Sequence, residues 1–129
     1  MRYYPVLSVQ QPWAWLITHG FKDCENRTWS SPITGPIWIH AGLTWDQDGW
    51  EWVTGGMDSV VSVGDLQRCE KEAMSQRGGI VGTANIVRCT RFHDSPWADP
   101  AQFKFVIDKA GVCEFVKCRG QLKFFEVEV

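Results

Sequence analysis

A short polar segment, Lys22 to Trp29, holds the residue types best suited to bind an anion or move a proton. If the segment is extended, alternation of side chains places Glu25 and Arg27 on one face together with Trp29. A guanidinium can hold a phosphate or a base edge through two hydrogen bonds, while a neighbouring carboxylate orients it or acts as a general acid or base. The alternative interpretation is an ion pair that only holds the strand in place.

Aromatic and imidazole side chains supply a second set of candidates. Residues 37–41 form a short apolar run in which His40 shares one face with Trp38, a pair able to stack on and hydrogen-bond a nucleobase. A histidine that only satisfies structural hydrogen bonds is the alternative. Trp29 and Trp97 have polar neighbours in the sequence, which favours an exposed stacking platform at these two positions.

The cysteine pattern indicates neither a disulfide framework nor a zinc ribbon. The chain contains no CxxC pair and an odd number of cysteines, Cys24, Cys69, Cys89, Cys113 and Cys118. His19 and His93 have no sequence spacing to a cysteine or carboxylate that is typical of metal ligation. We therefore predict no metal and no cofactor.

The elements that must position these residues begin with a strand followed directly by a helix. Val6–Val9 is a β-branched run, and Pro12 suits the first turn of a helix that ends near Gly20, a residue that accepts a left-handed conformation. The alternation over residues 23–29 and the apolar run over residues 37–41 flank a Pro- and Gly-containing turn, which predicts a hairpin.

The rest of the chain alternates between helix and strand patterns. Residues 42–79 are typical of helix and loop, with Asp65 as the expected N-cap of a helix through Met74. Further strands are predicted over residues 80–91, 103–108 and 122–129, with Gly82 at a bend of the first. This order predicts an α+β fold, a small β-barrel of mixed strands with short flanking helices, in a single domain spanning residues 1–129.

Charge is unevenly distributed along a nearly neutral chain. The net charge of −2 excludes a globally basic nucleic-acid-binding protein, but residues 80–123 hold seven Lys and Arg against four acids. Residues 42–65 have five acids, no Lys or Arg, and several tryptophans, so this segment is a candidate surface for a protein partner. Because no membrane-spanning stretch or signal peptide is evident, we expect a cytoplasmic protein that does not enter a membrane.

Several short motifs occur together in one order: Gln11-Pro12-Trp13-Ala14, Gly20-Phe21-Lys22, Glu25-Asn26-Arg27, and Gly35 with Ile39-His40-Ala41. In this combination the segment resembles the opening signature of the ASCH domain family, a branch of the PUA-like β-barrel superfamily. Residues 79–82, 94–97 and 120–125 resemble later parts of bacterial and phage-borne members. The resemblance implies a PUA-like barrel with a cleft beside the first helix, suited to RNA or a nucleotide.

The resemblance favours a domain that binds single-stranded RNA or a nucleotide, with binding residues Gln11, Lys22, Glu25, Asn26, Arg27, Trp29, His40 and Trp97. We expect Lys22, Glu25, Arg27 and His40 to converge in one cleft. One alternative is a hydrolase of RNA or of a modified nucleoside, of the ribonuclease or amidohydrolase type, in which Lys22 and Glu25 would be catalytic. Glu25 stands where related amidohydrolases that act on acetylated cytidine have a threonine nucleophile. Another alternative is a protein-interaction adaptor that uses residues 42–65.

Overall fold

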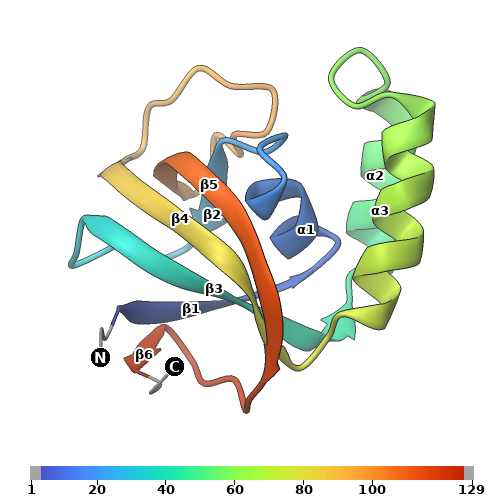
Figure 1. The fold of residues 1–129 in the computed structure, drawn as a ribbon. Helices are drawn as coiled ribbons and strands as arrows, with labels where there is room; N and C mark the ends of the chain where they lie inside the picture. The colour runs from blue at the N-terminus through green and yellow to red at the C-terminus, as the bar shows by residue number, and fades with distance from the viewer. Residues whose placement is uncertain (1–3, 127–129) are drawn as a thin grey trace.

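Six strands and three helices make up the fold of the computed structural model, which describes residues 4–126 (Figure 1). The strands are β1 (Pro5–Gln11), β2 (Cys24–Arg27), β3 (Gly35–Trp45), β4 (Gly79–Thr90), β5 (Phe103–Lys117) and β6 (Phe124–Glu126). The helices are α1 (Trp13–Thr18), α2 (Gln47–Gly56) and α3 (Val63–Ser75). None of the described helices is both long and apolar enough to cross a membrane.

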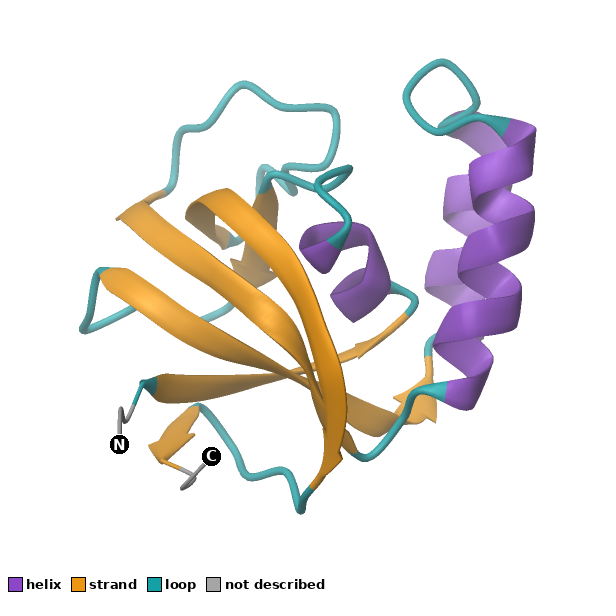
Figure 2. Ribbon diagram, viewed as in Figure 1, coloured by secondary structure: helices purple, strands orange, loops and turns teal. Residues whose placement is uncertain are grey.

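All six strands belong to one mixed sheet in the order β2-β5-β4-β3-β1-β6. Only the β1 and β3 pair is parallel among these neighbours. The sheet curls strongly around its apolar face (Figure 2), but no backbone pairing joins its described edge strands, β2 and β6. The predicted α+β class is confirmed, whereas the described strands form a curled sheet and not a closed barrel.

Helix α1 lies between the sheet and the pair formed by α2 and α3 (Figure 1). Ala14 and Ile17 pack into the core of the sheet, while Trp15 and Leu16 pack into a second core with α2 and α3. A helix that is buried on both sides must be apolar around its whole circumference, and residues 14–18 are all buried. The predicted start at Pro12 and the left-handed Gly20, with φ of +82°, are both present.

The predicted hairpin between residues 23–29 and 37–41 is wrong. Strand β2 pairs with β5, where Glu25 lies opposite Phe105, and both edges of β3 are occupied by β1 and β4. The parallel β1 and β3 pair buries Leu7 beside Ile39 in the main core. Burial of apolar side chains along β1 and β3 therefore favours the pairing of these two strands. The segment after β2 connects the edge strand β2 to β3 in the interior of the sheet.

Three boundaries also differ from those expected. Helix α3 is capped by Ser62, whose Oγ accepts a hydrogen bond from the Asp65 backbone N–H at 3.1 Å, so Asp65 lies in the first turn and is not the N-cap. The Asp65 carboxylate in turn accepts a hydrogen bond from Ser62 Oγ. Strand β5 continues to residue 117 because it pairs with β4 beyond Gly82. The last strand begins at Phe124 and not at residue 122, and positions 127–129 of the predicted strand lie outside the described residues.

Candidate functional site

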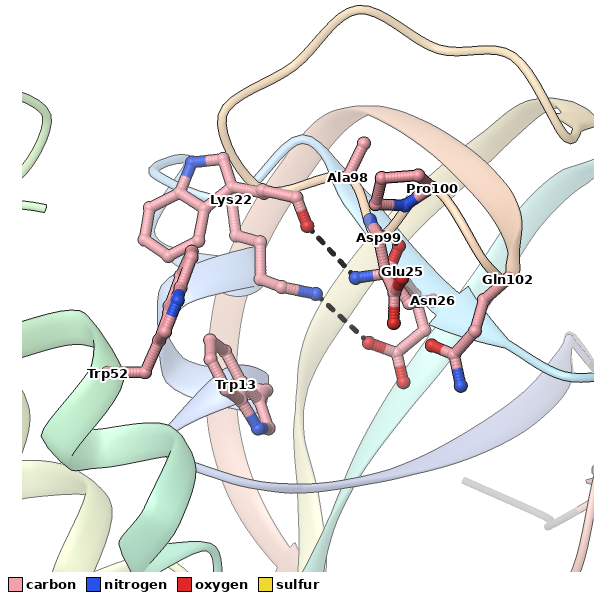
Figure 3. Close-up of a pocket in the computed structure, with 10 residues that line it drawn as sticks. Trp13, Lys22, Glu25, Asn26, Trp52, Ala98, Asp99, Pro100 and Gln102 are labelled. Atoms are coloured by element: carbon pink, nitrogen blue, oxygen red, sulfur yellow. Dashed lines mark hydrogen bonds and ion pairs between the residues drawn. The ribbon is translucent and has the colours of Figure 1, made fainter. Parts of the chain in front are cut away.

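A pocket of about 430 Å³ opens beside the start of α1 (Figure 3). Its polar wall comes from the turn before β2 and from β2 itself, and its aromatic wall comes from α1, α2 and the loop between β4 and β5. The main lining side chains are Lys22, Glu25, Asn26, Trp13, Trp52 and Trp97, with Asp99 and Gln102 at the loop side. A pocket of this volume is large enough for a small organic ligand.

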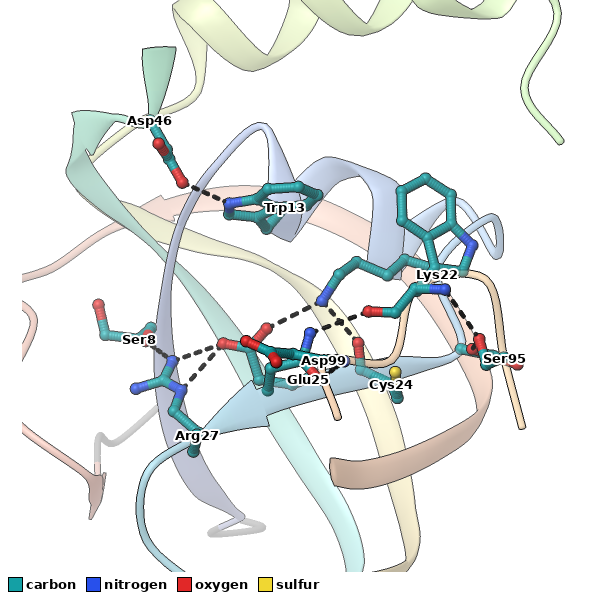
Figure 4. A network of polar contacts seen from close by, with 12 residues as sticks. Ser8, Trp13, Lys22, Cys24, Glu25, Arg27, Asp46, Ser95 and Asp99 are labelled. Carbon is teal, nitrogen blue, oxygen red and sulfur yellow. Dashed lines mark hydrogen bonds and ion pairs between the residues drawn. The ribbon is translucent and has the colours of Figure 1, made fainter. Parts of the chain in front are cut away.

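Lys22, Glu25 and Arg27 form a continuous buried network (Figure 4). Lys22 Nζ donates to Glu25 Oε1 at 3.2 Å and to the Cys24 carbonyl oxygen at 2.6 Å. Arg27 contacts the other carboxylate oxygen, Oε2, through Nε at 2.9 Å and Nη2 at 2.8 Å. Glu25 and Arg27 thus share one face of β2, as the alternation of side chains predicted.

Burial and charge act on Glu25 in opposite directions. The side chain of Lys22 is 4% exposed and that of Glu25 is 9% exposed, so both ions are almost removed from water. Burial raises the pKa of Glu25, but the positive charges of Lys22 and Arg27 outweigh this effect and hold its pKa below the ordinary value. Glu25 is therefore a carboxylate at neutral pH and compensates the two cations.

A second pocket, of about 330 Å³, adjoins the first on the Arg27 side. Glu25 and Trp13 line both pockets, while Arg27, Gln10 and Lys123 line only the second. Arg27 Nη2 also donates to the Ser8 carbonyl oxygen at 2.8 Å. This hydrogen bond links β2 to β1, two strands that are not neighbours in the sheet. No described protein atom accepts a hydrogen bond from Arg27 Nη1, so this nitrogen is available to a ligand.

Three indole rings form the aromatic wall of the first pocket. The centroid of Trp52 lies 6.3 Å from that of Trp13 and 6.2 Å from that of Trp97. Trp13 is fixed because its Nε1 donates to Asp46 Oδ2 at 2.8 Å, and Asp46 is itself the N-cap of α2. Trp97 is only 4% exposed, whereas Trp52 is 52% exposed. Of these three rings, Trp52 therefore has the face most open to a ligand.

Asn26 fixes the loop that completes the pocket. Its Nδ2 donates to the Trp97 carbonyl oxygen at 2.9 Å, and its Oδ1 accepts from the Asp99 backbone N–H at 3.0 Å. The whole amide group is thus occupied by the loop backbone. Asn26 lines the pocket, as its sequence position suggested, but its contacts position Trp97 and Asp99.

His40 lies outside the two pockets around Glu25. Its Nδ1 is 2.9 Å from Ser8 Oγ, and its Nε2 is 2.8 Å from the Cys118 carbonyl oxygen. The imidazole is 1% exposed and borders a separate pocket near Gly120. Lys22, Glu25 and Arg27 contact one another as expected, although Lys22 lines only the first pocket and Arg27 only the second. The expected convergence in one cleft is wrong for His40, because alternation along β3 places its side chain on the opposite face from the core residue Ile39, where it contacts the C-terminal segment.

Gln11 and Trp29 also lie away from the first pocket. Gln11 is fully buried; its Oε1 accepts from the Trp15 backbone N–H at 2.8 Å and its Nε2 donates to the Gln76 carbonyl oxygen at 3.0 Å. Trp29 packs edge-on against Phe105 with 5.1 Å between ring centroids. The exposed stacking platform expected at Trp29 and Trp97 is absent, since Trp97 is buried and Trp29 is half-buried.

Trp52 is the main pocket residue that sequence reasoning did not single out. It belongs, with Trp45 and Trp50, to the acidic segment 42–65 that the sequence indicates as a surface for a protein partner. Within α2, Trp50 and Val53 form the buried stripe and Trp52 lies off it. A tryptophan outside the apolar stripe of an amphipathic helix is a recognisable signal for an exposed aromatic.

The basic C-terminal half does not form one binding surface around the pockets. Lys104 is 1% exposed, and its Nζ donates to two backbone carbonyl oxygens, those of Arg91 and Gln102. Of the seven Lys and Arg residues in residues 80–123, Lys123 lines the second pocket together with Arg27. Lys109 is exposed and lines neither of these two pockets.

Comparison with known proteins identifies one domain type over almost the whole chain. A family model described as the ASCH domain matches residues 7–125. Activating signal cointegrator 1 of Homo sapiens is 51% identical over 35 residues, which are 27% of this chain and 6% of the human protein. Activating signal cointegrator 1 of Mus musculus is 49% identical over 35 residues, which are again 27% of this chain and 6% of the mouse protein. The similarity thus spans a small part of these two relatives.

Proposed function

The chain belongs to the ASCH domain family, and from this membership and the two adjoining pockets we propose that it binds single-stranded RNA or a nucleotide. The observation that carries the proposal is the position of Glu25. It separates a pocket with an aromatic wall from a pocket with two cationic side chains, Arg27 and Lys123. A nucleotide has the same two parts, a flat base and an anionic phosphate.

The first pocket is better suited to a base than to a phosphate. Its charged side chains are Lys22, Glu25 and Asp99, so the acids outnumber the bases. The open ring of Trp52 offers a stacking surface, and Asp99 can accept hydrogen bonds from the N–H groups of a base. Lys22 Nζ uses two of its three N–H groups on protein oxygens, which leaves one for a ligand.

The second pocket is better suited to the phosphate. Its lining includes two cationic side chains, Arg27 and Lys123, and one carboxylate, Glu25, so the net charge of the lining is positive. A guanidinium that is already held by a carboxylate and a carbonyl oxygen is preorganised, and its free Nη1 can hydrogen-bond a phosphate oxygen without a large loss of side-chain entropy.

Fluorescence anisotropy with short labelled single-stranded RNA tests both halves of the proposal. Arg27→Ala removes the cation of the second pocket, and the exposed Lys109→Ala is its control. We expect Arg27→Ala to weaken binding by about 1–3 kcal/mol, and Lys109→Ala by much less. Circular dichroism establishes that each variant is folded. Wild-type affinity of a folded Arg27→Ala protein would contradict the phosphate site.

The aromatic half is tested by Trp52→Ala with Phe92→Ala as its control. Both rings are exposed, at 52% and 88%, but Phe92 is on the loop between β4 and β5 and does not line either pocket around Glu25. Because stacking on one base contributes about 1–3 kcal/mol, Trp52→Ala should lose that much affinity and Phe92→Ala should bind like wild type. Equal losses in both variants would contradict a base site at Trp52.

No described contact favours the hydrolase alternative over binding. Both oxygens of Glu25 are occupied by Lys22 and Arg27, and a carboxyl group with a lowered pKa is a weak general base. Thr28 is exposed and lies after the end of β2 at Arg27. The middle tryptophans do not favour the adaptor alternative, because Trp50 is 9% exposed and packs in the core, and the exposed Trp52 lines the first pocket.

A further inference from the structure

Three side chains with metal-ligating atoms meet at the start of β2, and one of them comes from a distant part of the sequence. Asp23 and Cys24 come from the turn into β2, and His93 comes from the loop between β4 and β5. One carboxylate oxygen, the Cys24 Sγ and one imidazole nitrogen all lie within 4.8 Å of one another. Asp23 Oδ2 and His93 Nε2 are 3.6 Å apart.

The nitrogen of His93 that faces Asp23 lacks a hydrogen-bond partner. His93 Nε2 is buried, and no described atom lies within hydrogen-bond distance of it. Leaving a buried polar atom unsatisfied costs about 1–3 kcal/mol, so such an atom in a folded protein requires an explanation. The distance of 3.6 Å to Asp23 Oδ2 is too long for a hydrogen bond but is normal between two ligands of one ion.

We propose that Asp23, Cys24 and His93 form a binding site for Zn²⁺. Thiolate, imidazole and carboxylate are the three donor groups that zinc takes from proteins. Zinc bonds of about 2.0–2.3 Å in tetrahedral geometry place the ligand atoms roughly 3.3–3.6 Å apart. The 3.6 Å between Asp23 Oδ2 and His93 Nε2 already matches this range, and Cys24 Sγ lies within 4.8 Å of both atoms. The sulfur and nitrogen donors make the site unsuited to Ca²⁺ or Mg²⁺, which prefer oxygen ligands.

The surroundings support three protein ligands and one position open to water. The side chain of Asp23 is 51% exposed, so an ion can reach it from solvent. Ser95 Oγ donates to Asp23 Oδ1 at 2.6 Å, which leaves Oδ2 toward His93 and orients the carboxylate (Figure 4 shows Ser95 beside Cys24). Cys24 is fixed by its pairing with Val106 of β5. One Zn²⁺ with one thiolate and one carboxylate forms a site of zero net charge.

A zinc ion at this site would join β2 to the loop between β4 and β5. The same loop carries Trp97 and Asp99, which line the first pocket, and Asn26 already fixes it from the other side. The bound ion would thus hold the outer wall of that pocket. The zinc site itself rests on its own three ligands and does not depend on what the pocket binds.

Titration of the reduced protein with Co²⁺ tests the site, because cobalt substitutes for zinc and a thiolate ligand gives an intense charge-transfer band. We expect one equivalent of Co²⁺ to produce this band and Zn²⁺ to displace it. Cys24→Ser should abolish the band. Cys113→Ser, which changes a half-buried thiol on β5 away from the cluster, should leave it unchanged.

A second variant keeps the test decisive if Cys24→Ser does not fold. His93→Gln replaces a side chain that is 13% exposed, and we expect it to weaken Zn²⁺ binding roughly tenfold or more in competition with a chromophoric chelator. A protein that gives no band with excess Co²⁺ would overturn the site. A band that persists in folded Cys24→Ser, or unchanged zinc affinity in folded His93→Gln, would also overturn it.

Discussion

Glu25 connects the two cations of the candidate site, and its charge therefore matters for stability as well as for binding. Its carboxylate contacts Lys22 on one side and Arg27 on the other, with almost no exposure to water. Removing one partner from such a buried network leaves uncompensated charge, which costs more than the intact network gains. The effect on folding is greatest where the carboxyl group is ionised.

Glu25→Gln should lower the free energy of unfolding at pH 7 by on the order of 3 kcal/mol, because the buried Lys22 and the half-buried Arg27 lose their counter-charge. The pKa of Glu25 is lower in the folded protein than in the unfolded chain. The contribution of the ionised carboxylate to the free energy of unfolding is therefore complete above the unfolded pKa of about 4.3, and it is lost as the pH falls through the folded pKa. The variant should therefore lose less stability than wild type on acidification from pH 5. Urea unfolding between pH 3 and 7 measures this difference.

The control for this prediction is Glu51→Gln, which removes an exposed carboxylate on α2. It should unfold close to the wild-type midpoint at pH 7. Parallel acid profiles for wild type and Glu25→Gln would show that the buried carboxylate does not contribute through its ionised form.

At the scale of single elements, the short helix α1 depends on the strand before it. Gln11 ends β1, and its side chain caps the first turn of α1 through the Trp15 backbone N–H while it holds Gln76 at the end of α3. One amide group thus joins three elements at a fully buried position. Such a residue is needed because the N-cap of α1 is Pro12, whose side chain cannot accept a capping hydrogen bond.

Gln11→Ala should destabilise the protein by about 1–3 kcal/mol, since it leaves a backbone N–H and a backbone carbonyl without a partner in the interior. The neighbouring Gln10→Ala is the matched control because Gln10 is exposed. Thermal and urea unfolding of both variants give the comparison. If the two variants unfold alike, the buried amide contacts of Gln11 do not contribute to stability.

At Gly82, strand β4 lies very close to α1 and β5. A Cβ atom at this position would clash with the Gly111 carbonyl oxygen and with the side chain of Thr18. Gly82→Ala should therefore destabilise the fold by about 1–3 kcal/mol, and by the upper part of this range because backbone atoms must move. Gly55→Ala in α2 meets no atom and should be neutral or stabilising by up to about 1 kcal/mol. Denaturant unfolding separates these opposite signs, and destabilisation by both variants would contradict the close approach at Gly82.

At the scale of the whole molecule, a net charge of −2 gives no long-range attraction for RNA. Capture must then depend on the local charge of the pocket that contains Arg27 and Lys123. Each phosphate contact to single-stranded RNA contributes a slope of about −0.7 to the dependence of log affinity on log salt concentration.

Two such contacts predict a slope of about −1.4, and Arg27→Ala should reduce its magnitude by about 0.7. Anisotropy titrations at several salt concentrations measure both values. Lys109→Ala should keep the wild-type slope, because Lys109 is exposed and lines neither pocket beside Glu25. A slope that does not change in Arg27→Ala would place the phosphate contacts elsewhere on the protein.

Local pattern in the sequence determined the features that depend on neighbouring residues. The α+β class, the strand that leads into the helix at Pro12, and the shared face of Glu25 and Arg27 follow from periodicity and backbone preferences, which act over a few residues.

The tertiary structure decided which distant segments meet. Period-two alternation is identical whether β2 pairs with β3 or with β5, and only the burial of the assembled core distinguishes these pairings. For the same reason three placements could not be predicted from the sequence: Trp52 lines the pocket, His40 lies outside it, and His93 lies beside Cys24. These contacts depend on the packing of whole elements, which no spacing along the chain encodes.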